Sequence, residues 1–332
     1  MWKSIAEKFH CPIIQNNFEM PLYRLLGSRD AWDIHGRTNF LTRLNEAFYA
    51  YARENESFYI HDLNFVSADY GLKEWSNPLF WNMYKYAMCF EAIPSFAFSV
   101  SHIIKSIFGK NKKALTLDLD NTLWGGVVGD DGVDGIEIGQ ETGVSQSYYE
   151  FQTYVKQLKS LGIVLTVCSK NDHENAIAGL NHPEGALRPD DFVIIKANWE
   201  NKDRNIAETA AELNILPDSI VFADDNPAER EIVRTQIKGA AVPDMDGVEN
   251  YITTIDRSGF FEVTTFSEDD LKRNEMYKKN ALRAAEMASF GDYNDYLKSL
   301  EMHAVIDDFI PVYLARITIT DVQHAKSEAK RS

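Results

Sequence analysis

The sequence predicts an α/β protein whose central part forms a Rossmann-like, doubly wound parallel sheet. Three observations indicate this fold class. Short apolar runs recur between residues 114 and 223, amphipathic segments separate them, and polar residues suited to chemistry follow several of the runs. Continuous apolar runs are typical of strands that are buried on both faces, and their alternation with helices favours parallel connections.

The elements of this central part can be assigned in order. The expected strands are residues 114–119, 163–168, 192–195 and 219–223, with a short final strand at 240–242. The expected helices are residues 145–161 and 204–213. In the first helix, Phe151, Val155 and Leu158 share one helical face, and Gly162 is suited to end the helix in a left-handed conformation.

The flanking parts are less regular. Residues 39–52 have apolar residues at helical spacing, 57–63 resemble a short strand, and 75–108 look largely helical with an interruption at Pro94. The basic break 109–113 marks a boundary. After it come a charged helix from Ser267, with Asp270 in capping-box-like spacing, a helix at 293–300 and a polar tail at 324–332 expected to fray. We therefore predict domains at 1–110, 111–262 and 263–332.

Composition restricts the function classes. The 332 residues allow roughly two domains, with 45% hydrophobic and 25% charged residues, as in ordinary soluble proteins. No apolar run approaches the roughly 20 residues of a membrane span, nor does the N-terminus resemble a signal peptide. Three scattered cysteines disfavour a disulfide framework and fit a reducing cytoplasm. A net charge of −16 disfavours a nucleic-acid surface. We expect a cytoplasmic protein with neither nucleic-acid nor membrane partners.

Residues suited to phosphoryl transfer follow the predicted strands. The first strand runs into Asp118 and Asp120, the second into Ser169, Lys202 opens the helix after the third, and the fourth runs into the pair Asp224-Asp225. The carboxyl ends of parallel strands share one edge of the sheet, where active sites lie. An Asp-x-Asp pair alone fits a solvated turn equally well. The whole ordered set favours an aspartyl-phosphate mechanism with a hard cation such as Mg²⁺.

This order of motifs resembles the haloacid-dehalogenase-like (HAD) superfamily. The resemblance implies an enzyme in which Asp118 attacks phosphorus and Asp120 acts as general acid and base. Ser169 and Lys202 would hold the phosphoryl group of a phosphorylated small molecule. The Mg²⁺ ligands that it implies are Asp118, the backbone carbonyl of Asp120, and Asp224, with Asp225 as a further ligand or a support.

A short glycine-rich segment, residues 124–132, stands where the superfamily usually carries a cap. It predicts an essentially capless site with a flap, which suits a macromolecular substrate or a partner protein that closes the site. An ordinary β-hairpin without a substrate role is the alternative. The candidate substrate-binding residues around the flap are Asn121, Thr122, Trp124, Gly125, Gly126 and Asn171.

Longer strings resemble the FkbH-like branch of the superfamily. They are LDLDNTLWGGVVGDDGVDGIEIG, CSKND, Asn198-Trp199 followed by Lys202, and FADDNPAERE. The resemblance, over residues 16–316, implies transfer of a glyceryl unit from 1,3-bisphosphoglycerate to an acyl carrier protein, with loss of phosphate, in methoxymalonyl-type polyketide biosynthesis. It also implies a partial SGNH-hydrolase-like segment upstream, non-catalytic because the Gly-Asp-Ser nucleophile is missing. A truncated acetyltransferase-like α+β segment follows downstream, without the Gly-rich pyrophosphate loop.

Two alternatives to glyceryl transfer stay open. One is a plain phosphatase (a hydrolase) that acts on a small or protein-bound phosphate monoester, and the other is a non-enzymatic scaffold that docks the carrier protein. Cys168 also has two interpretations. Its thiol either carries the glyceryl group between acyl phosphate and carrier, or is a buried strand cysteine, which is common for this residue type. Trp124 and Trp199 flank the predicted site and either shape it or fill the core.

Overall fold

A computed structural model describes residues 1–265 and 272–280. These residues belong to one compact unit, Met1–Ala281. The predicted helix start at Ser267, the predicted helix at 293–300 and the tail at 324–332 lie outside the described residues. The predicted domain boundaries stay predictions.

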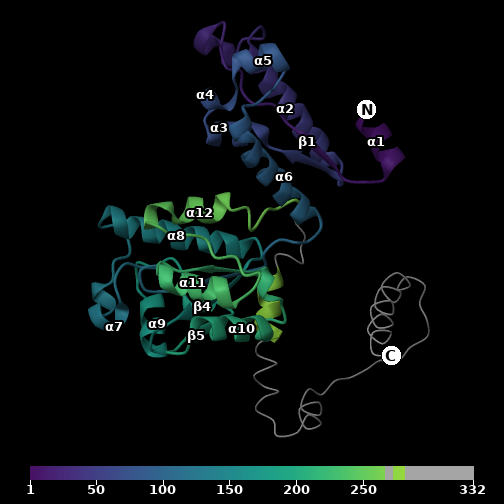
Figure 1. Cartoon of the computed structure of the whole chain (residues 1–332). Coiled ribbons are helices and arrows are strands. Elements are labelled where there is room, and N and C mark those ends of the chain that lie inside the picture. Colours follow the sequence, from purple (N-terminus) through teal and green to yellow (C-terminus); the bar gives the residue numbers. More distant parts are fainter. Residues whose placement is uncertain (266–271, 281–332) are drawn as a thin grey trace, which may run out of the picture. The chain divides into compact units, whose positions relative to one another are not determined.

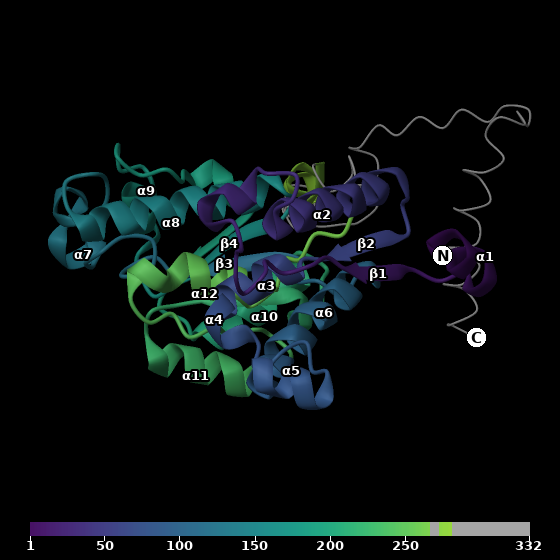
Figure 2. The ribbon, with the colours of Figure 1, turned by 90° about the horizontal axis from the view of Figure 1, so that it is seen from above.

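A four-stranded parallel sheet forms the centre of the fold (Figures 1 and 2). Its strands lie in the order β5-β4-β3-β6. In register, Leu117 lies opposite Val167 on one side and Ala223 on the other, so that the carboxyl ends of three strands reach the same edge. The strands are β3 (Ala114–Leu117), β4 (Val164–Ser169), β5 (Ile194–Ala197) and β6 (Ile220–Ala223).

Helices cover both faces of this sheet. The alternation of side chains along a strand sends Leu115 and Leu117 into one core and Ala114 into another. The first core also contains Phe151 of α8, and the second contains Ile206 of α10. The helices of the central part are α7 (Val128–Asp131), α8 (Gly143–Ser160), α9 (His173–Leu180), α10 (Lys202–Glu212), α11 (Pro227–Gln236) and α12 (Tyr251–Arg257). The doubly wound α/β fold is thus confirmed.

Local chemistry explains where α8 begins and ends. The Thr142 hydroxyl accepts a hydrogen bond from the Ser145 amide at 3.0 Å, and the Ser145 hydroxyl accepts one from the Thr142 amide at 2.8 Å. This reciprocal pair satisfies two amides that a helix start leaves without partners. Gly162 follows the last turn with φ 88°, as the sequence predicts.

Three predicted elements differ from the structure. The third strand is shifted from 192–195 to Ile194–Ala197, because Phe192 ends the 3₁₀ turn Pro189–Asp191 and its amide donates to the Pro189 carbonyl at 3.1 Å. The predicted strand at 240–242 is reduced to a single bridge between Val221 and Ala241. Pro94 lies in the first turn of α6 (Ile93–Ile107) and does not interrupt a helix, since an amide there has no intrahelical partner to lose.

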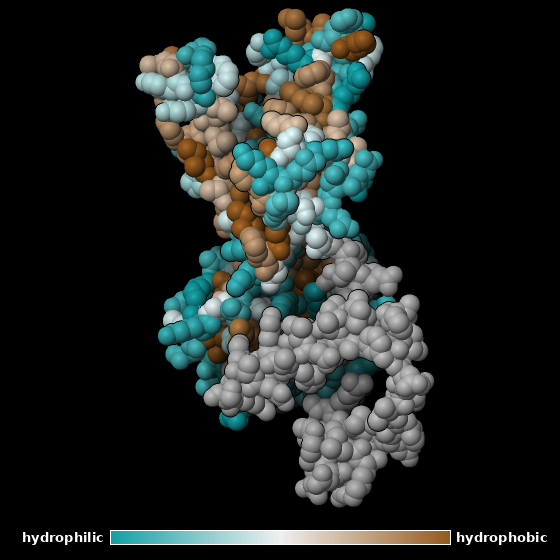
Figure 3. Space-filling model, turned by 90° about the vertical axis from the view of Figure 1, so that its right-hand side faces the viewer, coloured by the Kyte–Doolittle hydropathy of each residue, from teal (hydrophilic) through white to brown (hydrophobic). Residues whose placement is uncertain are grey.

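The N-terminal part builds a smaller α/β arrangement. Two parallel strands pair, β1 (Ile13–Asn16) with β2 (Phe58–His61). Its helices are α1 (Trp2–Phe9), α2 (Arg37–Glu54), α3 (Leu63–Tyr70), α4 (Leu72–Trp75), α5 (Pro78–Tyr84) and α6. Hydrophobic side chains lie exposed on this part (Figure 3). On α5 they include Leu79, Trp81, Met83 and Tyr84.

No helix in the described ranges combines the length and the apolar character that a membrane crossing requires.

Candidate active site

Four strand ends bring the predicted reactive residues to one edge of the sheet. Asp118 directly follows β3, Ser169 ends β4, Lys202 is the first residue of α10 after β5, and Asp224 directly follows β6. All four are buried, with exposed fractions between 0% and 6%. The parallel register therefore places them as the sequence predicts.

Lys202 links two of the carboxylates. Its Nζ atom lies 3.0 Å from Asp118 Oδ1 and 2.6 Å from Asp224 Oδ2. Burial opposes the charge of the ammonium, but Asp118 and Asp224 outweigh this effect and raise the pKa of Lys202. The lysine is therefore charged at neutral pH, and it is held where it can also bind a phosphoryl oxygen.

The acidic residues form a group that fits a divalent cation. One carboxylate oxygen each of Asp118, Asp224 and Asp225 lies within 4.8 Å of the others. Burial, and next the charge of Asp118, raise the pKa of Asp224 to about 6 despite Lys202. The same two causes raise the pKa of Asp225. Asp118 Oδ1 is buried and forms an ion pair with Lys202 at 3.0 Å, but no residue in the described ranges makes a hydrogen bond to it. Carboxylate oxygens crowded in this way suit Mg²⁺.

Two neighbouring side chains brace this acidic group. The Thr122 hydroxyl accepts a hydrogen bond from the Asp225 amide at 3.1 Å. The Arg230 guanidinium donates to the backbone carbonyls of Asp224 at 3.0 Å and Asp225 at 2.7 Å, and to Asp246 Oδ1 at 3.0 Å. Thr122 thus contacts the acidic loop. The sequence analysis does not predict Arg230 as a site residue. Its position one helical turn after Asn226, which follows the acidic pair, is the signal that could have indicated it.

Asp120 is hydrogen-bonded to the flap and to the loop after β4. Its Oδ1 accepts hydrogen bonds from Trp124 Nε1 at 2.9 Å and from the Val128 amide at 3.1 Å, and its Oδ2 accepts one from Asn171 Nδ2 at 2.9 Å. Burial raises the pKa of Asp120. Trp124 and Asn171, predicted as substrate-binding residues, are bound here to the predicted acid and base.

The flap is closed at its base by backbone pairing. Gly125 and Glu137 exchange two backbone hydrogen bonds, at 3.0 and 2.8 Å, and α7 lies between them. Asn121 has φ 57° and accepts a hydrogen bond from the Gly126 amide at 2.9 Å, while the Tyr251 hydroxyl donates to its carbonyl at 3.1 Å. The flap is therefore more than a simple hairpin. Substrate contacts by Asn121, Gly125 and Gly126 stay predictions.

Cys168 and Trp199 lie in contrasting environments. The Cys168 thiol is fully buried, 3.7 Å from the Lys202 carbonyl, and burial raises its pKa to about 12. This environment favours the interpretation as a strand cysteine. Trp199 is 71% exposed, and its indole donates to Asp172 Oδ1 at 2.9 Å, so that its ring is at the surface and not in the core.

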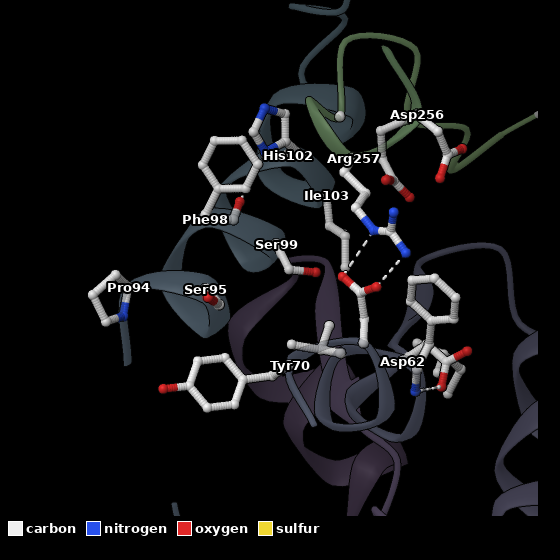
Figure 4. Close-up of a pocket in the computed structure, with 16 residues that line it drawn as sticks. Asp62, Tyr70, Pro94, Ser95, Phe98, Ser99, His102, Ile103, Asp256 and Arg257 are labelled. Atoms are coloured by element: carbon white, nitrogen blue, oxygen red, sulfur yellow. Dashed lines mark hydrogen bonds and ion pairs between the residues drawn. The ribbon is translucent and has the colours of Figure 1, made fainter. Parts of the chain in front are cut away.

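A large cavity lies elsewhere, away from these residues. It has a volume of about 800 Å³ and is lined by one face each of α3 and α6 and by residues 256–262 (Figure 4). Phe98 and His102 of α6 face it, and the Arg257–Asp69 ion pair lies at its wall. The acids, lysine and serine at the strand ends do not line this cavity, so it is distinct from the candidate active site.

Comparison with known proteins supports an assignment to a family. No family model matches the sequence, and no curated protein matches it. A solved structure does match: the N-terminal part of a Bacteroides fragilis protein that contains a phosphatase domain, complexed with Mg. The two share 35% sequence identity with a TM-score of 0.75, over 80% of this chain and 71% of that chain. The chain belongs to the family of this phosphatase-domain protein.

Membership of the phosphatase-domain family confirms the coarser part of the resemblance. The family accounts for the mixed α/β fold with a parallel sheet. The FkbH-like branch, the SGNH-like and acetyltransferase-like segments and the carrier protein stay predictions.

Proposed function

We propose that the chain is a Mg²⁺-dependent phosphatase that works through an aspartyl-phosphate on Asp118. The observation that carries this proposal is the contact of Lys202 with both Asp118 and Asp224, at 3.0 and 2.6 Å, beside a third carboxylate. The match to a phosphatase domain complexed with Mg supports it. The vestigial scaffold is disfavoured, because a degenerate site would be expected to have lost at least one of these residues.

In the proposed first step, a carboxylate oxygen of Asp118 attacks the phosphorus atom. The bond between phosphorus and the leaving oxygen breaks, and that oxygen takes the proton of Asp120. In the second step, water gives a proton to Asp120 and attacks the aspartyl-phosphate, which releases inorganic phosphate and restores Asp118. Lys202 and Ser169 hold the phosphoryl oxygens.

Mg²⁺, held by Asp118, Asp224 and Asp225, would neutralise charge on the transferring phosphoryl group. Arg230 and Thr122 keep two of these ligands in place through their backbone.

The finer proposal is glyceryl transfer to a carrier protein. In this reaction the carrier thiol attacks the acyl-phosphate carbonyl of 1,3-bisphosphoglycerate, and its proton passes to the departing phosphate. A thioester forms as the carbon–oxygen bond to phosphate breaks, and the phosphatase centre then hydrolyses the remaining phosphate ester. The FkbH-like strings support this substrate, and the short flap with no large cap suits a phosphate presented by a protein.

One experiment separates these functions. The protein and Mg²⁺ are incubated with 1,3-bisphosphoglycerate and phosphopantetheinylated carrier protein, and carrier mass and released phosphate are read together. A glyceryl-carrier adduct supports glyceryl transfer, whereas phosphate release without an adduct supports the plain phosphatase. If no phosphorylated substrate yields either product, the enzymatic proposal is wrong and the scaffold interpretation gains.

A further inference from the structure

The Asp120 carboxylate is held by three donors from three segments. Trp124 belongs to the base of the flap, the Val128 amide to the start of α7, and Asn171 to the loop after β4. The donor residues are nearly inaccessible, with exposed fractions of 1%, 3% and 4%. Hydrogen bonds to an ionised acceptor are the stronger kind, and both oxygens are engaged, so the rotation of this carboxylate is restricted.

Counting lone pairs shows what remains free on Asp120. A carboxylate offers about four acceptor positions, two on each oxygen. Oδ1 already accepts from Trp124 and Val128, and Oδ2 accepts from Asn171. One position is left, on Oδ2. A proton that Asp120 transfers without breaking one of these bonds has to occupy it.

We infer that Trp124 and Asn171 are positioning residues, which orient Asp120 so that Oδ2 delivers the proton to the leaving group. Because the acid role of Asp120 belongs to the proposed function, the inference rests on that function. Neither residue needs to touch the substrate. Their role is to fix the carboxylate and to couple it to the flap.

Packing against α9 holds Trp124 in this place. A Cβ atom added to Gly179 would lie 2.8 Å from two ring carbons of Trp124, closer than real Cβ contacts come. Gly179 is the penultimate residue of α9 and lies at this contact. Gly179 therefore makes the room that the ring needs to reach Asp120.

The alternative is that Trp124 only fills the core and that its indole N–H donates to Asp120 without a role in catalysis. Buried indole N–H groups usually have a hydrogen-bond acceptor. The two interpretations differ in what a substitution does. A core residue affects stability and all substrates alike, whereas a residue that positions the acid lowers kcat/KM most for the substrates whose leaving group needs a proton.

The kinetic test uses two phosphate esters with Mg²⁺. The phenolate of 4-nitrophenyl phosphate leaves without a proton, whereas the alkoxide of glycerol 3-phosphate needs one. For Trp124→Phe, Asn171→Ala and Gly179→Ala, we expect kcat/KM on glycerol 3-phosphate to fall by about 10²-fold, the usual contribution of general acid catalysis. On 4-nitrophenyl phosphate we expect kcat/KM to fall less than about threefold, because kcat/KM covers the steps up to release of the leaving group and leaves out the later step in which Asp120 is the base. Equal losses on both esters, or none, would overturn the inference.

Two control variants match these changes. Trp75 is also 1% exposed, and its Nε1 has no hydrogen-bond partner among the described residues. Trp75→Phe therefore removes a buried indole without removing such a bond. Gly143 is the first residue of α8, and a Cβ atom added there would have no atom within 4 Å. Gly143→Ala therefore tests a glycine-to-alanine change in a helix that causes no clash. Both should leave the ratio of the two kcat/KM values unchanged.

A measurement that needs no turnover separates this inference from the proposed function. In a ¹H–¹⁵N spectrum, the indole N–H signal of Trp124, identified by its loss in Trp124→Phe, should move upfield in Asp120→Asn while that of Trp75 stays. An unmoved Trp124 signal would overturn the inference even in an active enzyme. If wild-type protein hydrolyses neither ester, the proposed function fails, and the indole signal still decides whether Trp124 holds Asp120.

Discussion

Replacing Lys202 with methionine should strongly destabilise the metal-free protein. The lysine lies 3.0 Å from Asp118 and 2.6 Å from Asp224, and the three side chains are 4%, 9% and 0% exposed. Without the ammonium, two buried carboxylates face each other uncompensated. Removing one partner of a buried ion pair costs about 3–5 kcal/mol. That is a large share of the roughly 5–15 kcal/mol that keeps a domain folded.

The loss should depend on pH and on Mg²⁺. The pKa of Asp224 is already raised to about 6, and Lys202 is one of the groups that lower it, so the substitution raises it further. A carboxyl group whose pKa is raised in the folded state restores stability as the pH falls through that pKa. The deficit of Lys202→Met should therefore shrink between pH 8 and pH 5. Mg²⁺ at 100 times its Kd should raise the free energy of unfolding of the variant at pH 8 by about 2.7 kcal/mol above its value in EDTA.

Urea unfolding in EDTA and in Mg²⁺, at both pH values, measures these effects. Lys170→Met is the matched control: Lys170 lies 2.6 Å from Glu229, but its side chain is 35% exposed, so we expect a loss below about 1 kcal/mol. The reasoning is refuted if Lys202→Met loses no more than this control in EDTA, or if its deficit is the same at both pH values. Should Lys202→Met not fold, adding Asp118→Asn removes one uncompensated charge and should restore folding.

Three further predictions follow from the same residues. Asp118→Asn should abolish the release of phosphate but leave the circular dichroism spectrum of the folded protein unchanged, because it removes the nucleophile and keeps the shape of the side chain. Unchanged release would rule out the aspartyl-phosphate. The native Cys168 thiol, with its pKa near 12, should be alkylated by iodoacetamide at pH 8 far more slowly than the exposed Cys11, as read by mass spectrometry; equal rates would contradict its burial. In the absence of metal, the free energy of unfolding of the wild type, measured with urea relative to Asp224→Asn, should rise by up to about 3 kcal/mol as the pH falls from 8 to 4. The reason is that the pKa of Asp224 is about two units above its usual value. A constant difference in free energy between the two proteins would contradict the raised pKa.

Much of the fold and of the site could be predicted, because both depend on local patterns. The apolar runs ending at Leu117 and Ala223 are buried on both faces, and such runs are typical of central strands. Parallel pairing then brings residues that follow different strands to one edge. The positions of Asp118, Lys202 and Asp224 at the site thus follow from the strand pattern and the motif order.

The pairings between side chains could not be predicted. Asn171 lies 51 residues from Asp120 in sequence, and nothing local to either one indicates that the two are bonded. Gly179 appears only as a weak point in a helix until the Trp124 ring is seen against it. Arg230 looks like an ordinary helix-surface residue, although it is 4% exposed. Such contacts depend on how separate elements pack, which residue types and spacing do not determine.

The charges of the site bear on how a phosphate can enter it. The carboxylates of Asp118, Asp224 and Asp225 crowd together, and the ammonium of Lys202 is already engaged by two of them. A phosphate dianion would approach an excess of negative charge in surroundings where burial strengthens repulsion. A divalent cation held by Asp118, Asp224 and Asp225 would offset this repulsion. Burial, and next the charge of Asp118, raise the pKa of Asp224, so the carboxylates that would hold the cation are destabilised in its absence.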